Sequence, residues 1–285
     1  MINNKILALK YRPQEFKDLI GQEIMAQTIT NAIKLGKTPN AYLLTGIRGV
    51  GKTTTARLIA KALNCVKKFD EGENCEAGEY CHCAEIVNSN HMDILEMDAA
   101  SKTGIDDVRE LIENAKYSPT SAKFKIFIID EVHMLSKQAF NGLLKTLEEP
   151  PSRLKFILAT TEVRKIPVTI LSRCQRFDLK RVNLEKLFLH LKDIAKKENG
   201  SISDGAIQLI ARASEGSVRD AISLLFTLWL INARSNKEIA SRTDPSDAFA
   251  ISWSALSAIL PFSFLEIFLR CKNSFSRFTL FKSNL

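Results

Sequence analysis

The sequence predicts an α/β fold in which helices flank a parallel sheet, followed by a small bundle of helices. Two observations support this prediction. Up to about residue 180, short apolar runs typical of buried strands alternate with longer segments of helical periodicity. From residue 182 to residue 225 only helical patterns remain. Alternating strands and helices are typical of a parallel sheet that helices cover on both faces.

The first predicted strand, AYLLT at residues 41–45, leads into a glycine-rich loop and then a helix beginning at Lys52. This order predicts a phosphate-binding loop, in which backbone N–H groups and the helix N-terminus attract a phosphate. Lys52 would reach the β- and γ-phosphates, and the Thr53 hydroxyl would ligate Mg²⁺. The residues expected around the nucleotide phosphates are Gly46, Gly49, Val50, Gly51, Lys52, Thr53 and Thr54.

A second strand, KIFIIDE at residues 125–131, ends in two acidic residues. We expect Asp130 to hold Mg²⁺ through water, and Glu131 to polarise the attacking water as a general base. A simple helix-capping acidic pair is the alternative. His133 gives the segment a DExH pattern, but a lone histidine at this place is more often packed than functional, so no role is assigned to it.

Two further strands are expected at residues 91–97 and 156–160, with helices at 105–115 and 137–147. Thr160 and Thr161 end a strand beside the acidic one, where a hydroxyl can sense a γ-phosphate. A strand-favouring threonine without a role is the alternative.

Arg173 follows a stretch marked by β-branched residues and a proline, IPVTILSRCQRF, with no acidic residue close by in sequence to pair with it. An arginine that reaches a γ-phosphate stabilises charge in the transition state. Taken alone, Arg173 is more typical of an ordinary surface arginine.

The C-terminal bundle is predicted from three apolar helical faces within residues 184–191, 207–211 and 218–225. Ser217 is the expected N-cap of the third helix. Arg219, at the start of that helix, could lean back over the nucleotide.

The composition indicates a soluble globular chain, with 45% hydrophobic and 25% charged residues. The N-terminus lacks the features of a signal peptide, so we expect a cytoplasmic protein.

Cys65, Cys75, Cys81 and Cys83 fall within nineteen positions, and clustered cysteines in a reducing compartment are more often metal ligands than disulfides. The net charge of +8 permits a polyanionic partner without requiring one.

Several segments together carry a family resemblance, in the family's own order. They are YRPQEFKDLIGQE, GIRGVGKTTTARLIAKALNC, DAASKTGIDDVRELIE, KIFIIDEVHMLSKQAFNGLLKTLEEPP, LATTEVRKIPVTILSRCQRF and SEGSVRDAISLL. Over about residues 1–225 the chain resembles the gamma/tau family of bacterial DNA polymerase III clamp-loader subunits, which are AAA+ ATPases.

The resemblance implies an AAA+ domain at residues 1–180 and a three-helix lid at 181–225. It also implies roles for single residues: Gly46–Thr53 as Walker A, Asp130 and Glu131 as Walker B, Thr161 as sensor 1, Arg173 as an arginine finger for a neighbouring subunit, Arg219 as sensor 2 in its own subunit, and Tyr11, Arg12 and Pro13 at the adenine base.

Similar proteins also carry a zinc module after the phosphate-loop helix, here expected at about residues 64–86 with Cys65, Cys75, Cys81 and Cys83 as ligands. Four thiolates around tetrahedral Zn²⁺ form a closed structural site. The C-x-C spacing of Cys81 and Cys83 departs from the family's C-x-x-C steps and strains a tetrahedron, so His82 or a neighbouring atom could substitute. Thiols that bind no metal are the alternative.

The implied activity is that of an ATPase within the DNA polymerase holoenzyme, with no DNA synthesis by this chain itself. ATP binding would close a ring of subunits around the sliding clamp and primed DNA, and hydrolysis would release them. The implied partners are the delta and delta-prime subunits and further gamma/tau copies, with DNA contacted through its backbone. A nucleotide-binding scaffold without turnover and another AAA+ motor, such as a branch-migration motor, are the alternatives.

Residues 226–285 depart from the family, which continues here into a helical collar. They contain no glycine and half of the chain's phenylalanines. We expect an out-of-frame or unstructured tail in place of the collar. Residues 248–265 lack charges, but four serines and Pro261 weaken the alternative of a membrane span, and no membrane association is expected.

Overall fold

The computed structural model describes residues 7–65, 82–102, 104–198, 200 and 202–241. Its centre is a five-stranded sheet of order β2-β3-β4-β1-β5 in which every neighbouring pair is parallel, as predicted. The strands are β1 (Ala41–Thr45), β2 (Ile94–Asp98), β3 (Lys125–Asp130), β4 (Leu154–Thr160) and β5 (Gln175–Asp178).

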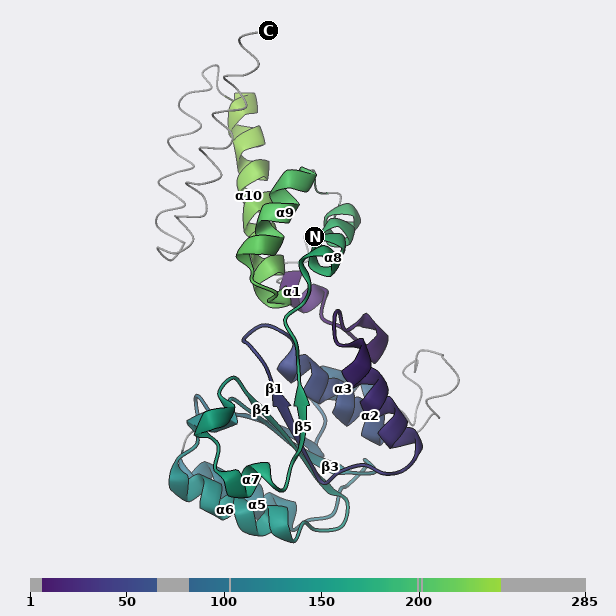
Figure 1. Ribbon diagram of the computed structural model, residues 1–285, viewed down its shortest axis with the longest axis vertical. Helices are drawn as coiled ribbons and strands as arrows, with labels where there is room; N and C mark the ends of the chain where they lie inside the picture. Colours follow the sequence, from purple (N-terminus) through teal and green to yellow (C-terminus); the bar gives the residue numbers. More distant parts are fainter. Residues whose placement is uncertain (1–6, 66–81, 103, 199, 201, 242–285) are drawn as a thin grey trace.

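Helices cover both faces of the sheet (Figure 1). One face packs against α2 (Glu23–Lys34) and α3 (Lys52–Asn64), and the other against α5 (Ile105–Ala115), α6 (Lys137–Glu148) and α7 (Val168–Leu171). The short elements are α1 (Leu7–Lys10), η1 (Phe16–Asp18), α4 (Cys83–Val87), η2 (Val132–Met134) and η3 (Val163–Lys165).

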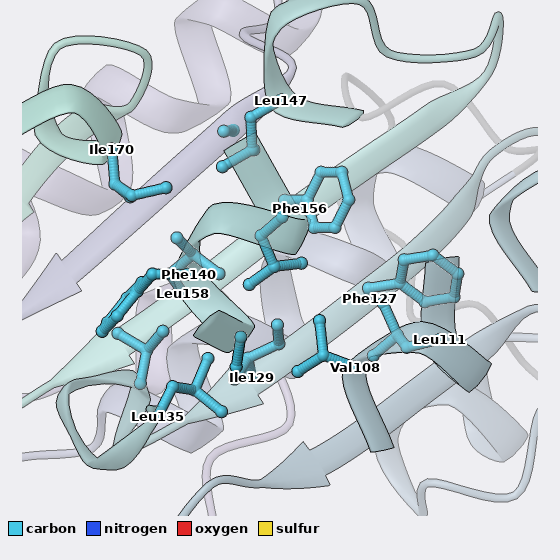
Figure 2. Close-up of a cluster of buried hydrophobic side chains, with 14 of the residues drawn as sticks. Val108, Leu111, Phe127, Ile129, Leu135, Phe140, Leu147, Phe156, Leu158 and Ile170 are labelled. Carbon is cyan, nitrogen blue, oxygen red and sulfur yellow. The ribbon is translucent and has the colours of Figure 1, made fainter. Parts of the chain in front are cut away.

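The continuous apolar runs of the central strands follow from burial on both sides. Successive side chains of a strand point to opposite faces, so Phe127 and Ile129 join the cluster under α5 and α6, whereas Ile128 joins the cluster under α2 and α3. Figure 2 shows the first cluster, in which Phe127 and Phe156 come from neighbouring strands. A strand with a solvent-facing side would instead alternate apolar and polar residues.

The strand β5 was not predicted from the sequence. Its four residues, QRFD, contain a single apolar side chain, that of Phe177, and the Gln175 and Arg176 side chains are exposed. Because β5 is a sheet edge, it pairs through its backbone with β1 and needs no apolar run.

Three helices form the lid: α8 (Leu184–Lys197), α9 (Asp204–Ala213) and α10 (Val218–Ser241). Ser217 caps α10 as predicted, since its Oγ accepts a hydrogen bond from the Asp220 backbone N–H at 3.3 Å. The N-terminal α1 also belongs to this packing unit, because Leu7 is buried in the lid cluster. The helix α1 therefore lies against the lid, although its position in the sequence predicted that it belongs to the ATPase domain.

The helix α10 continues beyond Leu225, where the sequence analysis placed the end of the lid. Phe226 and Leu228 are partly buried against the lid cluster, so the apolar face continues across that boundary. Residues 242–285, and with them the candidate span at 248–265, lie outside the described residues. Among the helices that the structure does describe, none is long and apolar enough to cross a membrane.

Candidate nucleotide-binding site

The loop between β1 and α3 has a backbone that requires its glycines. Gly46, Gly49 and Gly51 have φ angles of +149°, +75° and +103°, a region that residues with a Cβ rarely adopt. A Cβ at Gly46 would also lie 2.7 Å from the Leu179 carbonyl oxygen. This loop ends at the N-terminus of α3, where backbone N–H groups and the helix dipole favour an anion.

Lys52 is the first residue of α3, directly after this loop, and its side chain is only 4% exposed. Its Nζ donates to the carbonyl oxygens of Gly46 and Ile47, both at 3.1 Å, and lies 3.9 Å from Glu131 Oε1. Burial lowers the pKa of Lys52, and the negative charge of Glu131 opposes this shift. The predicted phosphate-binding lysine is thus held at the end of the loop, with its Nζ near the carboxylate of the predicted general base, Glu131.

The two predicted magnesium ligands, Thr53 in the first turn of α3 and Asp130 at the end of β3, are in contact. The Thr53 hydroxyl donates a hydrogen bond to Asp130 Oδ2, and Asp130 Oδ1 accepts the Glu131 backbone N–H at 2.9 Å. A hydroxyl beside a carboxylate is a fitting pair of oxygen donors for Mg²⁺, which is usually held by few protein groups together with phosphate oxygens. These residues therefore fit the ion that the sequence predicts.

Glu131 and Thr161 also lie together, at the ends of β3 and β4. Glu131 Oε2 accepts hydrogen bonds from the Thr161 backbone N–H at 3.2 Å and from its hydroxyl at 3.1 Å. Glu131 has a φ of +46°, in the left-handed region that is costly for a side chain of this size. This turn carries its carboxylate toward the end of β4, where the sequence placed a phosphate sensor.

The lid touches the phosphate loop directly. The Arg219 backbone N–H donates to the Gly49 carbonyl oxygen at 3.2 Å, and a Cβ at Gly49 would lie 2.1 Å from Ser217 Oγ. The start of α10 thus lies against the loop, which places the predicted sensor 2 residue, Arg219, beside it.

The three residues expected at the adenine base lie between the loop and the lid. Arg12 Nε donates to Thr54 Oγ1 at 3.0 Å, and burial together with the charge of Arg57 lowers the pKa of Arg12. The Tyr11 hydroxyl donates a hydrogen bond to the Glu198 carboxylate. Burial, and to a smaller extent this hydrogen bond, raises the pKa of Tyr11 to about 12. Pro13 is half-buried.

Arg173 lies far from the phosphate loop of its own chain. It precedes β5, whose Gln175 pairs with Tyr42 in β1, whereas Gly46 follows the other end of β1. The two ends of a strand of four to five residues are roughly 15 Å apart, so Arg173 and the phosphate loop lie at opposite ends of the strands. The Arg173 guanidinium is held instead by Glu148 Oε1 at 2.5 Å and by the Thr169 carbonyl oxygen at 2.6 Å.

Two of the four predicted zinc ligands can be placed. Cys83 is buried at the start of α4, Cys65 is half-buried after α3, and Cys75 and Cys81 lie outside the described residues. His82, Glu85 and His91 offer ligand atoms within 4.8 Å of one another. His82, the predicted substitute ligand, therefore lies in a cluster whose donor types suit zinc.

A further cysteine, Cys174, packs against the hydrophobic cluster under α5 and α6. Burial raises the pKa of its thiol to about 11. Two side chains without a predicted role contact predicted site residues. His133 contacts Glu131, and Glu148 holds Arg173.

Comparisons with known proteins agree with this geometry. Residues 21–183, more than half of the chain, match the family model described as DNA polymerase III, delta subunit. Residues 187–225 match the model of the DNA polymerase III clamp loader subunit, ATPase lid domain.

Curated relatives include DNA polymerase III subunit gamma of Buchnera aphidicola subsp. Baizongia pistaciae, 49% identical over 78% of this chain and 60% of the relative. DNA polymerase III subunit tau of Escherichia coli is 48% identical over 77% of this chain and 34% of the relative. The gamma/tau subunit of Mycoplasma genitalium is 46% identical over 87% of this chain and 40% of the relative. The chain thus spans about a third to three fifths of the length of these relatives.

Among solved structures, the RuvB Holliday junction branch migration motor of Thermotoga maritima is similar with a TM-score of 0.59. It is 22% identical over 86% of this chain and 73% of that one, which shows a common fold of sheet and lid helices and nothing about function. The level of identity distinguishes the two groups, since the polymerase III subunits are identical to this chain at nearly half of the aligned positions. The chain therefore belongs to the family of DNA polymerase III gamma/tau clamp-loader subunits.

Proposed function

We propose that this chain is an ATP-hydrolysing motor subunit that helps to load the sliding clamp onto primed DNA. The arrangement of Lys52, Thr53, Asp130 and Glu131 around the β1–α3 loop carries this proposal. Scaffold relatives that bind nucleotide without turnover commonly lose these side chains. Their presence, in contact with one another, favours an active ATPase.

The residues divide the work between binding and chemistry. The loop N–H groups and Lys52 bind the phosphates, and Thr53 and Asp130 hold Mg²⁺, which neutralises charge on the phosphate oxygens. Glu131 orients the attacking water and takes its proton, while Thr161 senses the γ-phosphate from the end of β4. Tyr11, Arg12 and Pro13 border the base, and Arg219 responds to the nucleotide from the lid.

We assign the role of arginine finger to Arg173, acting on the ATP of a neighbouring subunit. Its place at the sheet edge opposite the loop supports this assignment, because no rotamer of an arginine spans roughly 15 Å within the same chain. The partners would be delta, delta-prime and further gamma/tau subunits, with the sliding clamp and primed DNA as the load. Contact with the DNA backbone would weaken steeply with salt.

The cysteine-rich segment would hold one structural zinc ion through Cys65, Cys75, Cys81 and Cys83, with His82 as a possible replacement. The proximity of His82, Glu85 and His91 supports a metal site next to Cys83 in the sequence. A closed site of this kind would stabilise the segment and supply no chemistry.

Reconstitution tests the proposed function. The chain is mixed with delta, delta-prime and the sliding clamp, and ATP-dependent retention of the clamp on circular primed DNA is measured. We expect loading that requires ATP. Glu131→Gln keeps the size of the side chain but removes the base, so this variant should hold clamp and DNA with ATP but fail to release the loaded clamp. Tight ATP binding with no loading and no hydrolysis would instead favour the scaffold alternative.

A further inference from the structure

His133 is a nearly buried histidine beside the proposed catalytic carboxylate. It lies in η2, just after β3, and its side chain is 7% exposed. Its Nδ1 is 3.1 Å from Thr160 Oγ1 and 3.4 Å from Glu131 Oε2, and its Nε2 is 3.7 Å from Glu162 Oε1. One imidazole thus joins the acidic end of β3 to the sensor end of β4.

The surrounding groups indicate which ring nitrogen carries the hydrogen. Thr160 Oγ1 already accepts the Glu162 backbone N–H at 3.0 Å. An Nδ1 without hydrogen would direct its lone pair at the Glu131 carboxylate, and two acceptors at this distance repel each other. A hydrogen on Nδ1 forms a hydrogen bond with Thr160 Oγ1 at 3.1 Å and also attracts Glu131 Oε2, which lies 3.4 Å from Nδ1. We therefore assign the hydrogen to Nδ1.

This hydrogen adds a favourable electrostatic contact to one oxygen of Glu131, because Nδ1 and Glu131 Oε2 are 3.4 Å apart. The Thr161 backbone N–H and hydroxyl donate hydrogen bonds to the same oxygen. The Glu131 backbone has a left-handed conformation, so its carboxylate can move only by rotation about the side-chain bonds. Contacts from η2 and from the end of β4 restrict this rotation from two sides.

Resting on the ATPase activity proposed above, we propose that His133 is a positioning residue for hydrolysis, whose Nδ1–H holds the Glu131 carboxylate in place at the end of β4. Within the described part of the chain, His133 contacts Glu131, Thr160 and Glu162 and does not contact the phosphate loop. Loss of His133 should therefore slow hydrolysis without weakening nucleotide binding. A general base displaced by about 1 Å can lose roughly 100-fold in rate.

Three substitutions of His133 test this inference in the full chain. Asn places an amide N–H where Nδ1 stands, Gln places one nearer the position of Nε2, and Leu removes both. Single-turnover ATP hydrolysis is measured with enzyme in excess, together with the dissociation constant for ATP and the melting temperature of each variant. We expect His133→Leu to lower the hydrolysis rate about 10- to 100-fold, with ATP affinity within about twofold of the parent.

The comparison of the two amides separates positioning from packing. We expect His133→Asn to recover most of the rate and His133→Gln to recover little. A His133→Leu rate equal to that of the parent, an Asn variant no faster than Leu, or a Gln variant as fast as Asn would each overturn the inference. Glu131→Gln serves as the reference: if it hydrolyses ATP at the parental rate, the proposed role of Glu131 fails as well, and the two failures are distinguishable.

Discussion

Arg173 forms an ion pair with Glu148 of the same chain, in which the guanidinium and carboxylate are 2.5 Å apart. Glu148 is the last residue of α6, and Arg173 follows α7. Both side chains are partly exposed, so the pair contributes little to stability, on the order of 0–1 kcal/mol. The ion pair instead orients the Arg173 side chain, because it holds the guanidinium at the surface that the proposed neighbouring subunit would contact.

The first prediction concerns this arginine. Because Arg173 is proposed to act on a neighbour's ATP, turnover per chain should rise with protein concentration, and Arg173→Ala should remove that rise. Loss of an arginine finger typically lowers turnover by about 10³–10⁵-fold. Steady-state ATPase rates over a wide concentration range check this.

Two comparisons sharpen the test of Arg173. Glu148→Gln removes the ion pair but keeps the arginine, so its melting temperature and ATP affinity should stay close to those of the parent. A version with a family-like collar joined after Leu225 should gain activity at low concentration and lose the gain on Arg173→Ala. An Arg173-independent rate equal to that of the collar version would contradict the proposed role in trans.

The second prediction concerns zinc. Metal analysis of the full chain, purified under reducing conditions without chelator, should find one zinc per chain. Cys83→Ser should release it, because replacing a thiolate ligand with a hydroxyl weakens a structural site strongly. Cys174→Ser is the matched control, since Cys174 packs against the sheet cluster away from the cysteine-rich segment. Absence of zinc from the parent chain would contradict the proposed site and favour the alternative that these thiols bind no metal.

The fold and the core of the site could be predicted because they depend on local pattern. The alternation of apolar strands and amphipathic helices gave four strands of the sheet, and the glycine-rich loop could be placed at the start of α3. Asp130 and Thr53 could be paired because parallel strands end at one edge of a sheet. None of these inferences required knowledge of a long-range side-chain contact.

The features that were missed depend on tertiary packing. The strand β5 is polar and forms through backbone pairing with β1, which no residue pattern reveals. Glu148 meets Arg173 only because α6 and α7 pack side by side, although 25 positions separate the two residues. His133 looked like a packing residue, and its contact with Thr160 depends on β3 and β4 being neighbours in the sheet.

The third prediction is a pH dependence of stability at Asp93. Burial alone would raise the pKa of Asp93, but backbone N–H donors from Ala122, Ser121 and Thr120 lower it below the ordinary value of 3.8. A depressed pKa in the folded state contributes stability above the unfolded pKa, and this contribution is lost as the pH falls through the folded value. Asp93→Asn should therefore cost about 1–3 kcal/mol near pH 7 and progressively less below about pH 3.8.

Chemical unfolding of the parent and of Asp93→Asn at a series of pH values measures this difference. Asp106→Asn is the control, because Asp106 is an exposed residue that forms a surface ion pair with Arg109, and its substitution should change stability by less than about 0.5 kcal/mol. A difference between the parent and Asp93→Asn that stays constant down to pH 3 would show that the carboxylate charge is not what holds the 120–122 segment.

Binding of Mg-ATP to the parent and to Lys52→Ala, measured by calorimetry, tests the central claim most directly. Lys155→Ala is the matched control, because Lys155 is also a buried lysine, but its Nζ bonds to Asn40 Oδ1 at 2.9 Å and to the Thr38 carbonyl oxygen at the opposite edge of the sheet. We expect Lys52→Ala to abolish binding or weaken it by orders of magnitude, and Lys155→Ala to bind ATP like the parent even if it is less stable. Equal ATP affinity of Lys52→Ala and the parent would contradict the assignment of the β1–α3 loop as the nucleotide site.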